Sequence, residues 1–326
     1  MRWATCRHER VLTDPAPVNA PASAPSSHEL RRAIVMMLAS TLFFGSMAVV
    51  IRLASAELHP FEIAFFRNLF GFVFALPLLF RHGPGLLRTS HLSLYFVRCL
   101  IGIASMLCGF WAIVHLPLAE AISISYSTPL FVTIGAALVL GEVVRIRRWS
   151  AVVIGFLGVL LIVRPGAAGF SVHTLAALAA AVLSGCVAIS IKFLSRTEKP
   201  DAIVLYTTLL WVPMSLAPAL YVWTWPHGIT WLWIVLAGLF GTAGHMFWTR
   251  ALKLGDASML TPISFVQVLI VGVYGWLLFD ETVDGWTVAG ASVILVANSY
   301  IAYRETRLAR QTVTDPQIGS QSRLSG

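Results

Sequence analysis

The stretch Gly45–Ser55, GSMAVVIRLAS, returns 140 residues later at Gly185–Ser195 as GCVAISIKFLS. Glycine, alanine, isoleucine and serine recur at the same spacing, and a basic side chain, Arg52 or Lys192, stands at the same place in each copy. Offsets of 140 or 139 residues also pair positions further along: Pro60 with Pro200, Gly102 with Gly241, Ser125 with Ser264, and Glu142 with Glu281. A constant offset over successive apolar segments is hard to obtain from shared composition, so the sequence predicts a duplication.

The chain is too apolar for a water-soluble protein, because 57% of its 326 residues are hydrophobic and only 12% are charged. Ten apolar stretches have the lengths expected of membrane spans: 33–54, 61–80, 93–114, 119–140, 149–163, 175–194, 202–223, 231–251, 257–279 and 286–303. Their apolar residues run continuously and do not alternate, which favours helices over a β-barrel. The predicted fold class is an all-α integral membrane protein with ten transmembrane helices.

Each copy of the repeat holds five spans, and five is an odd number. The second copy must therefore enter the membrane from the opposite face, which makes the two copies inverted repeats about a pseudo-two-fold axis in the membrane plane. We expect the repeats to cover residues 33–164 and 173–303, with disordered cytoplasmic tails at 1–32 and 304–326. Two such halves can exchange conformations, and a substrate site is expected between them near the midplane.

The formal net charge of +8 could indicate nucleic-acid binding, but the basic residues are distributed as they are in membrane proteins. With the N-terminus in the cytoplasm, 18 of the 23 Lys and Arg residues fall in cytoplasmic segments, and only Arg164 falls on the opposite side. The positive-inside rule then predicts that both termini are cytoplasmic. The expected partners are the lipid bilayer and a small-molecule substrate, and not nucleic acid.

Several junctions between the spans resemble those of a known family. They are HPFEIAFFRN at 59–68, LPLA at 116–119, Thr128-Pro129, LGE at 140–142, LGDAS at 254–258 and FDE at 279–281. Together with the ten spans and the duplication, they resemble the EamA family of the drug/metabolite transporter superfamily over residues 33–303. The resemblance implies a ten-helix inner-membrane carrier of small metabolites, often an exporter of amino acids or related compounds, with some members taking up nucleotides or vitamins.

The two halves differ in one respect in the fourth span of each repeat. The first half has Thr128-Pro129, where the second has Gln267-Val268, and the proline of the second half, Pro262, lies about one and a half turns earlier. Because proline breaks or bends a helix, we expect the two fourth helices to break at different depths.

Polar side chains in the fourth and ninth spans are candidates for a substrate site, since an unpaired polar group in hydrocarbon is costly. Thr261, Ser264 and Gln267 recur every three residues and share a helix face. The substrate-binding candidates from these two spans are Ser125, Tyr126, Thr128, Ser264 and Gln267. The alternative for the hydroxyl groups is that they bond back to their own helix. Gln267 cannot be satisfied so locally, which favours a place on a polar cavity.

His245 and Trp248 in the eighth span are two further candidates. The imidazole of His245 could exchange a proton or hydrogen-bond substrate, and the alternative is a neutral histidine bonded to a neighbouring helix. Trp248 and Tyr126 could form flat apolar walls for a substrate ring, although aromatic residues near helix ends are commoner as interfacial anchors.

Four basic residues lie within or at the edges of spans. We interpret Arg67 and Arg98 as structural or gating charges whose long side chains snorkel toward the interface. Arg52 and Lys192 lie near the ends of their helices on opposite faces and are expected to snorkel as well. No fixed charge is then expected at the centre, which argues against a strongly charged substrate.

Glu142 and Glu281 end the fourth helix of each repeat, where a carboxylate opposes the helix macrodipole. Helix stability therefore does not explain them. An ion pair at the closed end of each access state would explain their equivalent positions, and a solvated loop acid is the open alternative.

A carrier is the leading functional hypothesis. The competing classes are a membrane-embedded enzyme and a structural protein. An enzyme would need a catalytic constellation, and the sequence has no Gly-x-Ser-x-Gly, no His-Glu-x-x-His, no paired intramembrane aspartates and no nucleotide-binding loop. We expect no cofactor and no metal. Export of an amino acid-like compound leads, and uptake of a vitamin or nucleoside-like compound is the alternative. A monomer and a homodimer are both open.

Overall fold

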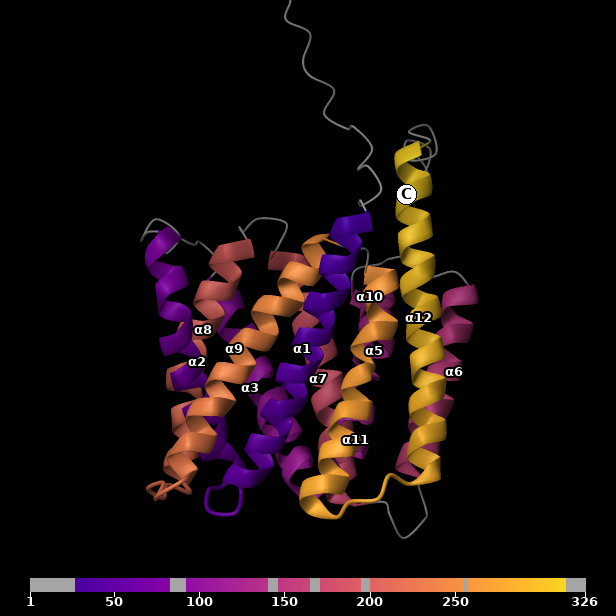
Figure 1. Ribbon diagram of the computed structural model, residues 1–326. Coiled ribbons are helices and arrows are strands. Elements are labelled where there is room, and N and C mark those ends of the chain that lie inside the picture. The colour runs from indigo at the N-terminus through magenta and orange to yellow at the C-terminus, as the bar shows by residue number, and fades with distance from the viewer. Residues whose placement is uncertain are drawn as a thin grey trace, which may run out of the picture.

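The computed structural model describes residues 27–82, 92–139, 146–164, 171–194, 200–254 and 257–314, and in these ranges the secondary structure is helical with no strand (Figure 1). The helices are α1 (Ser27–Ala54), α2 (Pro60–His82), α3 (Leu92–His115), α4 (Leu118–Ser125), α5 (Thr128–Val139), α6 (Ile146–Val163), α7 (Val172–Leu194), α8 (Pro200–Leu220), α9 (Thr230–Leu254), α10 (Ala257–Ser264), α11 (Val266–Phe279) and α12 (Gly285–Thr314).

Each of the ten expected spans coincides with one helix or with a broken pair of helices. Among the described residues, seven helical stretches are long and apolar enough to cross a membrane, and 149–163 and 209–220 are shorter apolar helices. The fourth span is divided into α4 and α5, and the ninth into α10 and α11. The prediction of an all-α membrane fold is confirmed.

Both broken spans carry a proline close to the interruption. Pro129 follows the first break and Pro262 precedes the second, and neither can donate to the carbonyl four residues earlier. The backbone tightens at both places: the amide of Ser127 donates to the carbonyl of Ile124 at 2.9 Å, and that of Phe265 to Pro262 at 3.3 Å. Bonds of this i to i+3 type are typical of a helix interrupted by a short turn.

The expectation that the two halves break at different depths is wrong. α4 and α10 have eight residues each, and their last residues, Ser125 and Ser264, stand 139 positions apart, which is the offset of the repeat. The breaks therefore lie at equivalent depths. The two prolines differ in position because they flank the same interruption from opposite sides.

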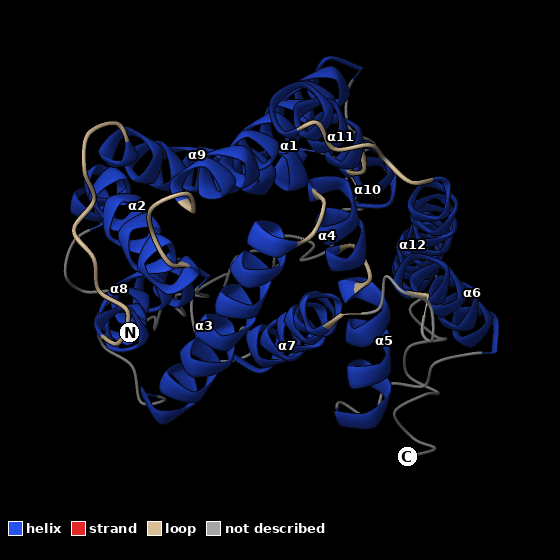
Figure 2. Ribbon diagram, turned by 90° about the horizontal axis from the view of Figure 1, so that it is seen from below, coloured by secondary structure: helices blue, strands red, loops and turns tan. Residues whose placement is uncertain are grey.

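Helix packing follows the inverted repeat. α1 packs on α9 as its counterpart α7 packs on α3, and α11 packs on α1 as α5 packs on α7. α6 pairs with α12, and α2 with α8, so these two pairs each join a helix to its own counterpart. Figure 2 shows the resulting ring, in which α9 lies between α2 and α1 while α3 lies between α8 and α7.

The ends of the described chain differ from the expected boundaries. α1 begins at Ser27, before the expected start of the span at 33, and α12 continues past 303 to Thr314. The expected tails are therefore partly helical within the described ranges. Residues 1–26 and 315–326 of those tails lie outside the described residues.

We call the end of the bundle that carries loops 55–59, 221–229 and 280–284 the lower end, as it is drawn in Figure 1. One continuous apolar core reaches this end and includes Ala54, Leu58 and Leu116. Toward the opposite, upper end lie two small separate clusters, one from α1, α9 and α10 and one from α3, α7 and α8. The apolar core is thus continuous at the lower end and divided into separate clusters at the upper end, and each upper cluster also joins helices of both halves.

Candidate functional site

The two helix breaks meet at the middle of the bundle. The ring of Tyr126, at the end of α4, stacks on that of Phe265, at the end of α10, with centroids 4.1 Å apart and an angle of 26° between the planes. Offset stacking of this kind is a favourable aromatic arrangement. Because Tyr126 and Phe265 are also related by the repeat offset of 139, the contact joins equivalent points of the two halves.

Polar groups freed at the breaks are satisfied across the two halves. The hydroxyl of Tyr126 donates to the carbonyl of Ser264, and it lies 3.1 Å from Oε1 of Gln267. The carbonyl of Tyr126 accepts from Nδ2 of Asn298 on α12 at 2.7 Å. The amide nitrogen of Gln267 donates to none of the residues that the structure describes. Gln267 thus keeps an available donor beside the stacked rings.

The small hydroxyl side chains of this region bond to their own helices. Ser125 donates to the carbonyl of Ile122, Thr128 to Ser125, and Ser264 to Thr261, all at 2.7 or 2.8 Å. Their protons are therefore engaged, and their oxygens stay available as acceptors. Ser125 is exposed, although the other residues of α4 are mostly buried.

One face of α9 is turned toward the interior of the bundle. Gly241, His245 and Trp248 follow one another at intervals of four and three residues and so share a helix face. On the opposite face, Leu232 and Leu239 are exposed as expected for contact with lipid. His245 and Trp248 are also exposed, although they face inward. Exposed side chains thus lie on both faces of α9.

Arg67 of α2 places its charged group against the inner face of α9. A Cβ atom on Gly241 would lie 2.9 Å from both Nε and Nη2 of Arg67. Gly241 is the twelfth of the 25 residues of α9, so the guanidinium lies near mid-depth. The expectation that Arg67 snorkels is wrong, and so is the expectation that the centre lacks a fixed charge. The side chain extends toward α9 because glycine leaves room for it there.

Arg98 is a contact between helices. It is 6% exposed, and its Nη1 donates to Oγ1 of Thr207 on α8. Its buried position does not fit a snorkelling side chain. Glu142, the other charged candidate of the first half, lies outside the described residues.

Arg52 and Glu281 join the two halves at the lower end. Nη1 of Arg52 lies 3.0 Å from Oε1 of Glu281, and both side chains are largely buried. Arg52 also donates to the carbonyls of Ile113, at 2.7 Å, and Leu116, while Oε2 of Glu281 accepts from the amide of Leu118 at 2.8 Å. The expectation that Arg52 snorkels is therefore wrong. One charge pair ties α1, α3 and α4 of the first half to the end of α11.

The sequence profile of the EamA-like transporter family matches residues 31–164 and, a second time, residues 173–303. The chain belongs to the EamA-like transporter family. It is a multi-pass transport protein of the inner membrane, and the resemblance inferred from the sequence is confirmed.

Relatives of this EamA-like chain include transporters with different substrates. It is 30% identical to a riboflavin transporter of Brucella anthropi over 76% of this chain and 89% of that protein. It is 28% identical to an S-adenosylmethionine uptake transporter of Rickettsia felis (79% and 88%) and 29% identical to the pseudopaline exporter CntI of Pseudomonas aeruginosa (82% and 95%). The crystal structure of another protein, which is 20% identical in sequence, shares the fold. Its TM-score is 0.59, and the match covers 83% of this chain and 96% of that one.

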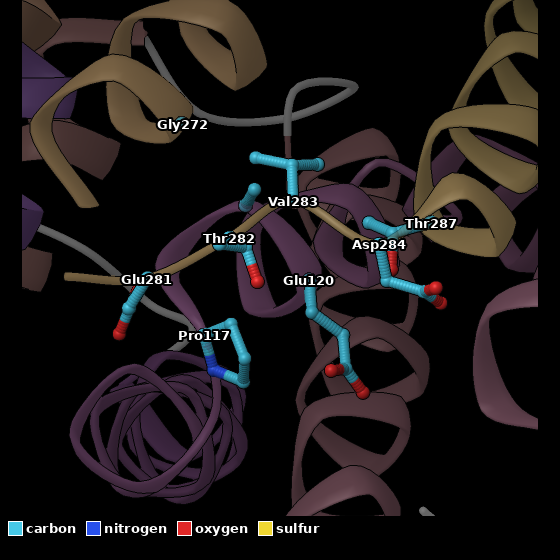
Figure 3. A pocket seen from close by; sticks show the side chains of 9 residues that line it. Pro117, Glu120, Gly272, Glu281, Thr282, Val283, Asp284 and Thr287 are labelled. Atoms are coloured by element: carbon cyan, nitrogen blue, oxygen red, sulfur yellow. The ribbon is translucent and has the colours of Figure 1, made fainter. Parts of the chain in front are cut away.

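A small pocket of this EamA-like transporter lies at the lower end, beside the Arg52–Glu281 pair. Its lining includes Pro117, Glu120, Glu281 and Asp284 (Figure 3). The side chain of Glu281 turns away from those of Glu120 and Asp284, in keeping with its pairing to Arg52. The pocket therefore borders the Arg52–Glu281 contact.

Two features of the site were not found from the sequence. The first is Asn298, which bonds to Tyr126. Its amide side chain within the last apolar span could have indicated the site, as the amide of Gln267 did. The pairing of Arg52 with Glu281 was missed because the residues are far apart in the chain and belong to different repeats.

Proposed function

We propose that this EamA-like chain is an alternating-access carrier whose substrate site lies at mid-depth, between the two helix breaks and the inner face of α9. The observation that carries the proposal is the contrast between the ends. The lower end is joined by Arg52, Glu281 and a continuous core, whereas His245 and Ser125 are exposed inside the bundle. An arrangement closed at one end and open inside fits one state of an alternating-access cycle.

The lower end is the extracytoplasmic end in this proposal, and both termini are cytoplasmic. The distribution of Lys and Arg along the sequence supports this orientation. The described conformation is then inward-facing. The equivalent outward-facing state would exchange the roles of the two repeats, which accords with their similar packing.

The residues around the breaks would bind the substrate. Gln267 supplies a free amide donor, Tyr126 supplies an aromatic face, and the acceptor oxygens of Ser125, Thr128 and Ser264 lie nearby along the broken helices. His245 and Trp248 would contact the substrate from α9. A polar site with aromatic walls suits a small molecule that has both a ring or apolar part and hydrogen-bonding groups.

We propose an amino acid-like metabolite as the substrate and export as its direction. The pseudopaline exporter among the relatives supports export. Uptake of a vitamin or nucleoside-like compound is the second candidate, and the riboflavin and S-adenosylmethionine uptake transporters support it. The proposal includes no chemical change of the substrate, and a homodimer stays a prediction.

Flux through the purified protein in liposomes tests the proposal. Pooled labelled amino acids, vitamins and nucleosides are placed inside or outside the liposomes, with and without an imposed pH gradient across the membrane. Saturable flux of one compound, lost in Gln267→Ala, supports the carrier and its site. Flux that does not saturate, or that Gln267→Ala and His245→Ala leave at the wild-type rate, contradicts the assigned site.

A further inference from the structure

We propose that Arg67 binds an anionic group, a carboxylate or a phosphate, of the transported molecule. This inference rests on the proposed carrier function and names the chemical class of substrate that the site accepts. It also revises the role of Arg67, which the sequence alone indicated to be structural or gating.

The guanidinium of Arg67 is held in place but not neutralised. Its Nη1 donates to Oδ1 of Asn68 at 2.9 Å, and Nδ2 of Asn68 donates to Oγ of Ser215 on α8 at 3.2 Å. Nε of Arg67 is buried and has no hydrogen-bond partner. None of the ion pairs among the described residues includes Arg67. A positioned cation with unused donors is thus available near mid-depth.

The acidic side chains nearest to Arg67 in the sequence are engaged elsewhere. Glu62, five residues earlier, accepts from the amide of His59 at 2.9 Å and from the amide and hydroxyl of Thr224. Glu57 accepts from His227 and Thr230 at the lower end. Neither carboxylate forms an ion pair with Arg67.

The guanidinium of Arg67 lies directly against α9, where Gly241 has no side chain to separate it from the helix. The next turn of the same helix face carries His245, which is exposed. A guanidinium favours planar, bidentate anions such as carboxylates, and it also binds phosphates. An unpaired charge inside a membrane protein is costly, which makes an intramembrane arginine a marker of a substrate path.

Binding of small anions to the purified, detergent-solubilised full-length protein tests this inference. The unfolding midpoint is titrated with benzoate, with phenyl phosphate, and with benzamide as the neutral match of benzoate. Stabilisation by ligand gives the dissociation constant. We expect benzoate or phenyl phosphate to bind at least about tenfold more tightly than benzamide, the ratio that one charge-assisted hydrogen bond supplies. The two anions distinguish carboxylate from phosphate recognition.

Three variants separate charge from packing. Arg67→Gln should reduce the affinity for the anion to that for benzamide. Gly241→Ala keeps the charge but brings a methyl group to within 2.9 Å of Nε and Nη2, so it should weaken anion binding by about tenfold even if Arg67→Gln does not fold. Gly102→Ala is the matched control, because Gly102 is the repeat equivalent of Gly241 and faces Trp211 instead of a charge.

Equal affinity of the wild type for benzamide and for both anions would overturn the inference, as would an anion preference that survives in Arg67→Gln or in Gly241→Ala. Flux in liposomes from the same preparation separates this result from the carrier proposal. Saturable flux without anion preference removes the anion site and leaves the carrier. Anion preference without flux of any pooled compound supports the anion site and contradicts the proposed substrates.

Discussion

Tyr126 and Phe265 stack on each other at the points where the fourth helices of the two repeats are interrupted. They stand 139 positions apart, at the offset that relates the repeats, so the pseudo-two-fold relationship brings a residue against its own counterpart. The hydroxyl that only Tyr126 carries then bonds to the neighbouring carbonyl of Ser264. The contact links the two halves at mid-depth, where the proposed alternating-access cycle would move them against each other.

Tyr126→Phe should preserve the stack and lose the hydrogen bonds to Ser264 and Gln267. We expect a loss of about 1 kcal/mol in stability, since this is the usual net value of such a bond, and a lower maximal flux. Tyr126→Leu should lose about 1 kcal/mol more by removing the aromatic pair. Thermal unfolding and liposome flux measure both effects. Tyr221→Phe, at a side chain that is 91% exposed, is the control, and an equal effect there would contradict the assignment.

Gln267→Ala and His245→Ala should each reduce flux by about tenfold while membrane insertion stays intact, because each removes a hydrogen-bonding group that faces the proposed site. Flux is normalised to the amount of inserted protein. Leu269→Ala, two residues after Gln267 on an exposed face of α11, serves as the control for helix packing. Wild-type flux in both test variants would refute the cavity assignment.

Glu281→Gln should destabilise the closed lower end by about 3 kcal/mol, because it leaves the largely buried charge of Arg52 without its countercharge. Asp284→Asn breaks the more exposed pair with Arg164 at the same end and should cost less than about 1 kcal/mol. Thermal unfolding of the two variants gives the comparison. Similar losses of stability in both variants would show that the Arg52–Glu281 pair stabilises the protein no more than the exposed Arg164–Asp284 pair does.

The repeat predicts a second charge pair. Lys192 is the counterpart of Arg52 and Glu142 that of Glu281, so the two should pair at the upper end in the outward-facing state. Glu142 and the side chain of Lys192 lie outside the described part of the chain. Glu142→Lys and Lys192→Glu should each slow flux, and the double reversal should restore it. A double variant as slow as the single ones would argue against the pair.

The stability of the lower end should depend on the ionisation of Glu57. Hydrogen bonds from Thr230 and then His227 hold the pKa of Glu57 below its ordinary value of 4.5. A carboxyl with a depressed pKa stabilises the folded state above the unfolded-state value, and this contribution is lost as the pH falls below 4.5 through the lowered pKa. As the pH is lowered from about 7 to 3, the melting temperature should therefore fall less steeply for Glu57→Gln than for wild type. Parallel curves would contradict the prediction.

The sequence was sufficient for the ten spans, the duplication and the family. Span length follows from bilayer thickness, and apolar composition is a local property that needs no knowledge of neighbouring helices. The repeat offset is likewise read directly along the chain, as the pairing of Gly45 with Gly185 shows. The candidates Ser125 and Gln267 were found in the same way, because polar groups in an apolar helix are conspicuous.

Only the tertiary structure decided which charged and polar groups meet. The sequence predicted that Arg52 snorkels, whereas the structure pairs it with Glu281 from the other repeat. Arg67 looked peripheral by its position in α2, but the missing side chain of Gly241 lets its guanidinium lie near mid-depth. A long side chain can reach several places, and the packing of helices distant in sequence determines which of them it occupies.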